Sequence, residues 1–332
     1  MVIPTDNPGE LLQISGNYWK TCTLHAAVKL DLFSLIRKRQ ATADSIGQLL
    51  NADTDSIERL LNALCAMGLL NKIDNLYENT QTSLKYLVID SPDYIGWMIL
   101  HHHHLVQSWS RLDQAVITGK PQRESSVAAP EKWREAFLKG MQTNAKLHAA
   151  AVVSAVDLSE RENLLDLGGG PGTYAIHFCK ANPGLFAVVF DLPASQPIAE
   201  ENINSEGLAD RIRFQGGDYH EDPIEGRFDV AWLSHILHAE GPESCREIIA
   251  KAGGALKPGG VILIHEFILN DNMDGPEFPA LFSLNMLVGT TSGRSYSESQ
   301  LKEMLSSAGF RSVRRLPFRG PTDSGILIGV AD

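Results

Sequence analysis

The sequence predicts an α/β domain built on a parallel sheet, preceded by a mainly helical domain. From residue 163 onward, apolar runs typical of strands alternate with segments of helical periodicity. This alternation is typical of a parallel sheet with helices on both faces. The predicted strands cover residues 163–167, 186–190, 211–214, 228–233 and 261–266. The first hundred residues show short amphipathic helices instead.

The N-terminal part of the chain is predicted to form three short helices followed by a hairpin. The predicted helices cover residues 20–37, 43–50 and 55–67. Apolar residues recur at helical spacing in the first and third, and Asp55 and Glu58 resemble a capping box. Two strand-like stretches then flank the turn Asp74-Asn75. This order is that of a winged helix, a module that binds DNA in some proteins and forms dimer contacts in others.

Two longer helical patterns, at 93–118 and about 131–156, connect the N-terminal part to the first predicted strand. Four consecutive histidines, His101 to His104, lie in the first pattern. Consecutive residues point around a helix and do not converge on one ion. We therefore expect one or two of these histidines to line a pocket rather than hold a metal.

Composition restricts the classes of protein that fit. With 332 residues, of which 43% are hydrophobic, the chain is long enough for two domains with sizeable cores. A formal net charge of −11 disfavours nucleic-acid binding, because an acidic surface repels phosphates. No apolar stretch approaches a membrane span, and no secretory signal is visible. The four cysteines lack C-x-x-C spacing, so we expect reduced thiols, no metal site and a cytoplasmic protein without a membrane partner.

A glycine-rich loop follows the first predicted strand. Leu164-Leu165-Asp166-Leu167 runs directly into Gly168-Gly169-Gly170-Pro171-Gly172, and a helix is expected from about Thr173. Glycines allow a sharp turn and a close approach of the backbone to a ligand. The G-x-G-x-G spacing differs from the G-x-G-x-x-G dinucleotide fingerprint and suits a ligand without a pyrophosphate. By itself the loop indicates only an adenosine-containing ligand.

Two further elements follow the next strands. Asp191 ends the second strand, where a carboxylate can accept both ribose hydroxyl protons or simply cap a helix. Gly217-Asp218-Tyr219 follows the third strand. There Asp218 can accept from an adenine amino group while Tyr219 packs on the ring. An ordinary turn explains the Gly217-Asp218 pair equally well.

Together these segments resemble the class I S-adenosylmethionine-dependent methyltransferases, and more narrowly the small-molecule O-methyltransferases with an N-terminal winged-helix dimerisation domain. The resemblance covers nearly the whole chain. The matching segments are Leu164 to Gly172, Asp191-Leu192-Pro193, Gly217-Asp218, Lys257-Pro258-Gly259-Gly260, Ser108-Trp109 and Lys139-Gly140-Met141. It implies a dimerisation domain at 1–110, linking helices and a pocket lid at 111–156, and a Rossmann-like catalytic domain at 157–332.

The resemblance also implies S-adenosyl-L-methionine as cofactor, a homodimer and a small-molecule methyl acceptor. The expected cofactor-binding residues are Asp166, Gly168, Gly170, Gly172, Asp191, Leu192, Gly217, Asp218, Tyr219 and Ser234. The family's general base is a histidine after the fourth strand, which matches His238, and the acidic residue that orients it matches Glu266. Both lie at ends of neighbouring parallel strands, the edge where open α/β sheets bind ligands.

The expected reaction is in-line methyl transfer to an oxygen of a small hydroxylated, aromatic metabolite. A histidine side chain is mostly neutral at pH 7 and can take the acceptor's proton. The expected wall of the acceptor pocket consists of Trp109, Phe137, Met141, Asn144, Asn285 and Met286. Apolar residues on helices serve equally often as core, so this is the least specific assignment.

The sequence departs from the family's plant members at three points. His238-Ala239-Glu240 replaces His-Asp-Trp, Ser234 replaces a common lysine, and Gly293 to Ser297 lacks the second acidic residue of Gly-Arg-Glu-Arg-Thr. These changes argue against the plant phenols as substrates. C- or N-methylation or non-methylating chemistry on the same fold are alternatives. The loop spacing disfavours a nicotinamide oxidoreductase, and the acidic charge disfavours a DNA-binding regulator.

Overall fold

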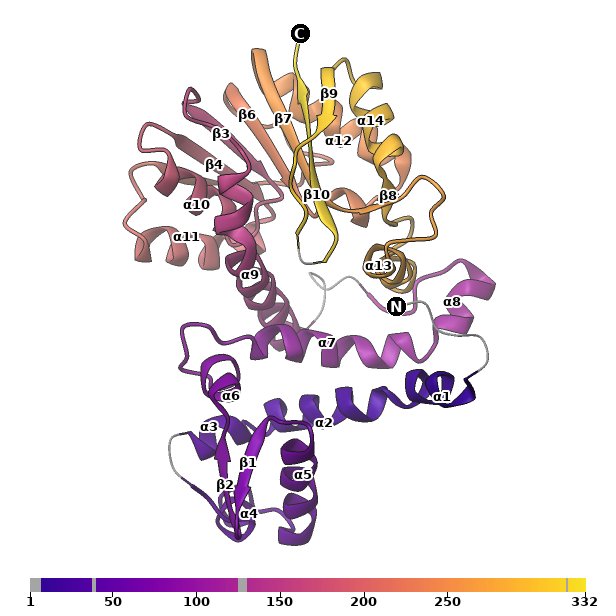
Figure 1. Cartoon of the computed structure of the whole chain (residues 1–332). Helices are drawn as coiled ribbons and strands as arrows, with labels where there is room; N and C mark the ends of the chain where they lie inside the picture. Colours follow the sequence, from indigo (N-terminus) through magenta and orange to yellow (C-terminus); the bar gives the residue numbers. More distant parts are fainter. Residues whose placement is uncertain (1–6, 38–39, 125–129, 321) are drawn as a thin grey trace. The chain divides into compact units, whose positions relative to one another are not determined.

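The computed structural model describes residues 7–37, 40–124, 130–320 and 322–332. The chain divides into two compact units, Met1–Leu105 and Val106–Asp332, which are described separately (Figure 1). The division lies inside helix α7 (Gly96–Trp109), whereas the sequence analysis places it at residue 110. The segment 111–156, predicted as a linking region, belongs to the second unit.

The first unit contains short helices around one hairpin. Its elements are α1 (Pro8–Gly16), α2 (Tyr18–Lys29), α3 (Leu32–Ile36), α4 (Ala43–Leu50), α5 (Thr54–Ala66), β1 (Leu70–Ile73), β2 (Leu76–Asn79) and α6 (Gln81–Tyr86). The predicted helix at 43–50 and the antiparallel hairpin are confirmed. Buried side chains of the helices and the hairpin form one core, including Phe33, Ile46, Leu61 and Tyr77.

Two details of the first unit differ from the prediction. The predicted helix at 20–37 is two helices, because Asp31 has a φ of 51° that interrupts the helical backbone. The N-cap of α5 is Asp53, not Asp55: its side chain accepts from the Ser56 backbone N–H at 2.8 Å. Asp55 therefore lies in the first turn, where a carboxylate faces the positive end of the helix dipole.

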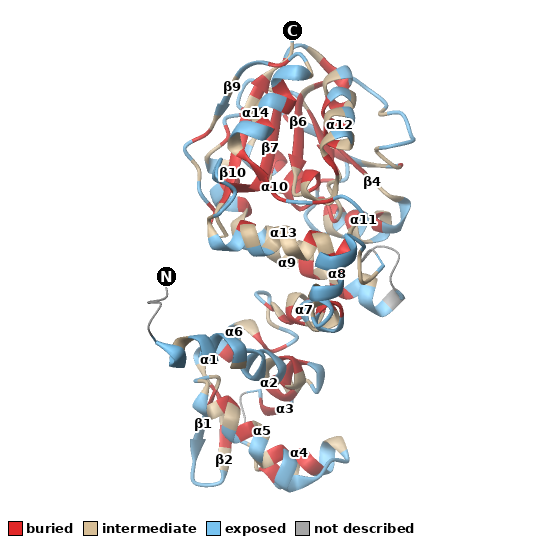
Figure 2. Cartoon of the chain, turned by 90° about the vertical axis from the view of Figure 1, so that its right-hand side faces the viewer, coloured by how far each residue is buried: buried red, intermediate tan, exposed pale blue. Residues whose placement is uncertain are grey.

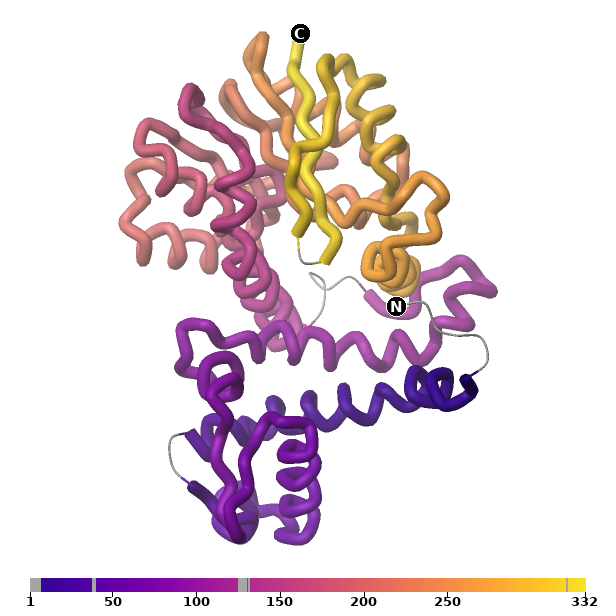
Figure 3. Tube along the Cα trace, viewed as in Figure 1, coloured from indigo at the N-terminus to yellow at the C-terminus, as the bar shows by residue number. Residues whose placement is uncertain are grey.

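The second unit is built on one mixed sheet with the order β5-β4-β3-β6-β7-β10-β9, and β8 pairs with the end of β7. Its strands are β3 (Asn163–Leu167), β4 (Phe186–Asp191), β5 (Ile212–Gly216), β6 (Phe228–Ser234), β7 (Leu256–Leu269), β8 (Tyr296–Ser297), β9 (Arg311–Arg315) and β10 (Ser324–Val330). The five predicted parallel strands are confirmed. Figure 3 shows β10, in yellow, running beside the orange β7; the two are antiparallel. The three later strands are absent from the prediction: β8 has two residues, β9 is mostly exposed and lacks an apolar pattern, and β10 is an apolar, mostly buried run that the sequence analysis missed.

Helices cover both faces of this sheet (Figure 2). Helices α9 (Glu131–Ser154), α10 (Thr173–Ala181) and α11 (Gln196–Ser205) pack on one face, and α12 (Pro242–Ala255) and α14 (Glu298–Ser307) pack on the other. Helices α8 (Leu112–Thr118) and α13 (Glu277–Gly289) contribute no residue to either of these cores, and η1 (Pro193–Ser195) and η2 (Leu237–Ala239) are 3-10 turns. The predicted helix at 93–118 is α7 and α8, because the backbone leaves the helical region at Arg111. No helix among the described residues is both long and apolar enough to cross a membrane.

Alternate residues of the strands enter two separate cores. Leu165 and Leu233 pack with α12 and α14, whereas Leu164 and Trp232 pack with α9, α10 and α11. Successive side chains of a strand point to opposite faces, so a strand covered on both faces must be apolar throughout. Asp166, Asp191 and Glu266 lie at or near the carboxyl ends of β3, β4 and β7, where the candidate site lies.

Candidate active site

The glycine loop connects β3 to α10 through backbone conformations that favour glycine. Gly168, Gly170 and Gly172 have φ values of 68°, 49° and 73°. A Cβ on Gly168 would lie 2.5 Å from Ile236 Cγ2, so a side chain there is excluded by space as well as by backbone strain. The loop therefore brings bare backbone to the edge of the sheet, as predicted from its composition.

Asp166 lies directly beneath this loop and is 1% exposed. Its Oδ2 accepts from the Ala175 backbone N–H at 3.2 Å, whereas its buried Oδ1 has no hydrogen-bond partner among the described residues. Burial raises the pKa of this carboxyl group to about 7. An unpaired buried carboxylate oxygen beside a loop of bare backbone fits a ligand that carries hydrogen-bond donors and positive charge, as S-adenosylmethionine does.

Asp191 ties the end of β4 to the glycine loop. Its Oδ2 accepts from the Gly170 backbone N–H at 2.8 Å, and its Oδ1 accepts from the Leu192 N–H and the Ser195 hydroxyl at 2.8 Å each. The helix-capping alternative is not observed, because the N-caps of η1 and α11 are Leu192 and Ser195 and neither helix has a side-chain cap hydrogen bond. Each carboxylate oxygen can accept two hydrogen bonds, so Asp191 keeps capacity for a ribose hydroxyl.

The segment after β5 lies next to Asp191. The Gly217 N–H donates to the Asp191 carbonyl at 2.9 Å, which joins the ends of the two strands. Asp218 Oδ1 accepts from the His220 N–H at 2.8 Å. This side chain therefore stabilises a turn, as the alternative explanation of Gly217-Asp218 predicts. The Tyr219 hydroxyl donates to Glu240 Oε1 at 3.1 Å, which gives the Glu240 of His238-Ala239-Glu240 a contact on the predicted adenine side.

His238 and Glu266 form a hydrogen-bonded pair at the ends of β6 and β7. His238 Nδ1 lies 2.8 Å from Glu266 Oε2, and the His238 backbone N–H donates to Oε1 at 3.2 Å. Burial alone would raise the pKa of Glu266, but the neighbouring His238 and His235 outweigh it and hold that pKa well below its usual range. An ionised carboxylate only accepts, so Nδ1 carries the proton and Nε2 is left to act as a base.

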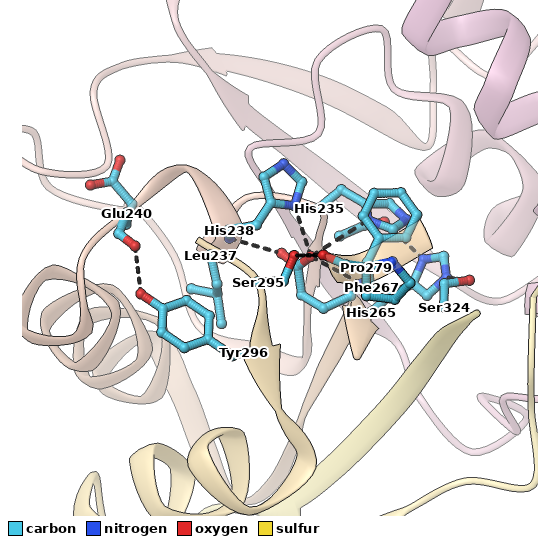
Figure 4. A network of polar contacts seen from close by, with 12 residues as sticks. His235, Leu237, His238, Glu240, His265, Phe267, Pro279, Ser295, Tyr296 and Ser324 are labelled. Atoms are coloured by element: carbon cyan, nitrogen blue, oxygen red, sulfur yellow. Dashed lines mark hydrogen bonds and ion pairs between the residues drawn. The ribbon is translucent and has the colours of Figure 1, made fainter. Parts of the chain in front are cut away.

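Two further histidines surround this pair (Figure 4). His235 Nδ1 lies 3.6 Å from Glu266 Oε2, and His265 lies 3.0 Å from the Ser234 hydroxyl and 3.1 Å from the Ser324 hydroxyl. Burial lowers the pKa values of both histidines. Ser234, expected at the cofactor, therefore contacts a buried histidine, and His235 is a member of the site that the sequence analysis missed.

The ligand-type atoms of His235, His238 and Glu266 all lie within 4.8 Å of one another, a spacing that a metal ion would also require. The sequence analysis predicts no metal. The 2.8 Å distance between His238 Nδ1 and Glu266 Oε2 is that of a direct hydrogen bond, which favours an acid–base pair.

Phenylalanines that the sequence analysis missed cover His238. The rings of Phe282 and His238 meet edge-on with centroids 4.7 Å apart, and Phe267 lies 4.7 Å from Phe282. Phe267 directly follows Glu266 on β7, and Phe278 and Phe282 lie one turn apart on α13. Only Phe267 is adjacent in sequence to a predicted site residue, Glu266, and that adjacency is the signal that could have selected it.

The predicted pocket wall is brought together only in part. Trp109 Nε1 donates to Asn285 Oδ1 at 3.0 Å, and Met286 is buried beside Asn285 on α13. Phe137, Met141 and Asn144 lie on α9 and are half-buried. In the described part of the chain, Met141 and Asn144 have no hydrogen bond or ring contact to Trp109 or Asn285.

Comparison with known proteins decides the family. A model of the O-methyltransferase domain matches residues 109–311, and a model of the O-methyltransferase dimerisation domain matches residues 12–88. The chain belongs to the O-methyltransferase family. This methyltransferase is 34% identical to the 3-hydroxy-5-methyl-1-naphthoate 3-O-methyltransferase of Streptomyces sahachiroi, over 97% of this chain and 95% of that protein.

Two further comparisons agree. The methyltransferase is 33% identical to the tetracenomycin polyketide synthesis 8-O-methyltransferase TcmO of Streptomyces glaucescens, over 95% of this chain and 94% of that protein. The structure of human N-acetylserotonin methyltransferase in complex with SAM matches it with a TM-score of 0.86 and 25% identity over 99% of both chains. The predicted family, fold class and enzyme class are therefore confirmed.

Proposed function

We propose that this O-methyltransferase transfers the methyl group of S-adenosyl-L-methionine to a hydroxyl oxygen of a small aromatic metabolite, with His238 as general base. The observation that carries the proposal is the 2.8 Å contact between His238 Nδ1 and Glu266 Oε2, beside the ring of Phe282. Two relatives, the 3-hydroxy-5-methyl-1-naphthoate 3-O-methyltransferase and the tetracenomycin polyketide synthesis 8-O-methyltransferase, make a polycyclic phenol the first acceptor class to test.

The route of the acceptor's proton follows from the arrangement of His238 and Glu266. Glu266 accepts from His238 Nδ1 and fixes the tautomer in which Nε2 is a proton acceptor. His238 Nε2 takes the proton of the acceptor hydroxyl as the oxygen becomes a nucleophile, and Glu266 stabilises the resulting imidazolium. Phe267 and Phe282 orient an aromatic acceptor by ring contacts and exclude water from its hydroxyl.

The cofactor supplies an activated methyl group on a sulfonium, and the chain supplies its position. We propose that the backbone of Gly168, Gly170 and Gly172 approaches the cofactor. Asp166 would pair with the positively charged part of the cofactor, and Asp191 would accept hydrogen bonds from the ribose. The remaining predicted contacts, from Leu192, Gly217, Asp218, Tyr219 and Ser234, surround the same strand ends.

We also propose that the enzyme is a cytoplasmic homodimer whose first unit, a winged helix, makes the dimer contacts. Helices α1 and α2 expose large apolar side chains, among them Leu12 at 72%, Tyr18 at 61% and Trp19 at 68%. Such a set is typical of a covered surface. The four cysteines are free thiols, which is the state expected in a reducing compartment.

A labelled-methyl assay tests the reaction. The purified chain is incubated with S-adenosylmethionine carrying a labelled methyl group and a panel of naphthols, anthracenols and amines of matched size. The proposal expects label in methyl ethers of the phenols. Label only on nitrogen or carbon, or no transfer although S-adenosylhomocysteine binds, contradicts it.

A further inference from the structure

Arg123 holds a partly buried guanidinium group that faces no acidic side chain in the described part of the chain. Its Nη1 lies 3.2 Å from the Ser108 hydroxyl, and its Nη2 lies 3.2 Å from Asn285 Oδ1 and 3.4 Å from the Asn285 carbonyl. These partners are neutral. The buried Nε has no hydrogen-bond partner among the described residues. Removing a cation from water without an anion is costly, so the arrangement is incomplete as it stands.

The surroundings of Arg123 are shaped to hold the guanidinium in place. A Cβ on Gly289 would lie 2.3 Å from Arg123 Nη2, so the absence of a side chain at Gly289 makes room for the group on α13. The neighbouring Gln122 N–H donates to the Val288 carbonyl at 2.8 Å and fixes the loop to the same helix. Asn285 is further held by Trp109. A guanidinium that Ser108, Asn285 and the space at Gly289 hold in place, but that no anion neutralises, is a candidate binding group for an anionic ligand.

Arg123 and the proposed base His238 contact the same face of α13. Phe282, which contacts the His238 ring, lies three residues before Asn285 on α13, so the two side chains share one face of the helix. One helical turn is about 5 Å, comparable to the width of an aromatic ring. A planar acceptor whose hydroxyl lies at His238 would therefore direct a substituent on its far side toward Arg123.

We propose that Arg123 recognises a carboxylate on the methyl acceptor, so that the substrate class is the hydroxylated aromatic acids rather than neutral phenols. A guanidinium presents a planar fork of N–H groups that matches a carboxylate. The anion would give Nε the partner it lacks. The inference rests on the proposed O-methyl transfer, since it assigns the other end of the same acceptor.

Binding to the chain saturated with S-adenosylhomocysteine tests this, by calorimetry with 3-hydroxy-1-naphthoate, its methyl ester and 2-naphthol. The wild-type chain is expected to bind the acid at least about tenfold more tightly than the ester, the scale of a charge-assisted hydrogen-bonded pair. Arg123→Met is expected to bring that ratio close to one, and Arg123→Lys to leave an intermediate ratio. Arg246→Met, which removes an exposed arginine paired with Glu303, is the matched control and is expected to keep the wild-type ratio.

Equal affinity of the wild-type chain for acid and ester, or no binding of the acid, overturns the inference whatever the variants do. A wild-type ratio that survives in Arg123→Met overturns it as well. Labelled-methyl transfer by the wild-type chain to 3-hydroxy-1-naphthoate and to 2-naphthol separates the two proposals. Transfer without acid preference contradicts only the role of Arg123, whereas acid preference without transfer to any phenol contradicts the proposed reaction.

Discussion

Asp166 and Glu266 are both buried carboxylates near the ends of strands in one sheet, but their surroundings act on them in opposite directions. Asp166 has an unpaired oxygen and no described cation beside it, and burial raises its pKa to about 7. Burial would raise the pKa of Glu266 too, but two histidines lower it well below the usual range. The acceptor half of the site, around Glu266 and His238, thus already pairs its carboxylate with histidines. The donor half, around Asp166 and the glycine loop, has a carboxylate without a positive partner among the described residues. This contrast supports the proposal that one sheet edge binds a cationic donor and deprotonates an acceptor.

Replacing the proposed base is expected to have the largest effect. His238→Ala should lower turnover at pH 7 by about 10²–10⁴-fold, because a positioned general base contributes on that scale. Its affinity for S-adenosylhomocysteine should stay unchanged, since the donor half is built from other residues. Steady-state kinetics and calorimetry on the same preparation check both parts, and unchanged turnover would remove His238 from the mechanism.

The glycine loop can be disrupted by substitution without changing His238 or Glu266. Gly168→Ala places a Cβ 2.5 Å from Ile236 Cγ2 on a backbone with a φ of 68°. We expect cofactor affinity to fall by about ten- to hundredfold, with a loss of about 1–3 kcal/mol in unfolding free energy. Gly184→Ala is the control, because a Cβ there meets nothing within 4 Å. Equal binding by both variants would contradict the role assigned to the loop.

The raised pKa of Asp166 predicts that cofactor binding depends on pH. The ionised carboxylate favours a cationic ligand, so the affinity for S-adenosylmethionine should increase by about tenfold between pH 6 and pH 8, across the pKa of about 7. Asp166→Asn should abolish this dependence. Calorimetry in buffers of different ionisation enthalpy measures the accompanying proton release, and a flat affinity in the wild-type chain would argue against the assignment.

The two carboxylates should also affect stability in opposite senses. Glu266 has a folded pKa below its unfolded value of about 4.3, so its contribution is present above that pH and is lost as the pH falls. Asp166 has a raised folded pKa, so its burial destabilises the fold as the pH rises from about 4 to 7. Without cofactor, Asp166→Asn should raise the unfolding free energy at pH 8 by up to a few kcal/mol. Denaturant titrations of the wild type, Asp166→Asn and Glu266→Gln at pH 4 and pH 8 test both signs.

The contrast also separates what the sequence could predict from what it could not. The glycine loop, Asp191 and Gly217-Asp218 are short contiguous motifs that follow strands, and β3 to β7 are recognisable as apolar runs. Arg123, Phe267 and Asn285 come from a loop, a strand and a helix distant in the sequence. Tertiary packing brings Arg123 to Asn285 and Phe267 to Phe282, so periodicity and spacing carry no signal for these contacts. The predicted pocket wall includes Asn285 but not its partner Arg123.

The central claim is that His238 removes the proton of the acceptor hydroxyl, and a pH series of single-turnover methyl transfer tests it most directly. The wild-type chain and His238→Ala, each saturated with labelled S-adenosylmethionine, are mixed with 3-hydroxy-1-naphthoate between pH 6 and pH 10. We predict that His238→Ala is slow at pH 7 and approaches the wild-type rate as the acceptor hydroxyl itself ionises, because a phenolate needs no base. A variant that matches the wild type at pH 7, or that stays slow on the preformed phenolate, would contradict the claim.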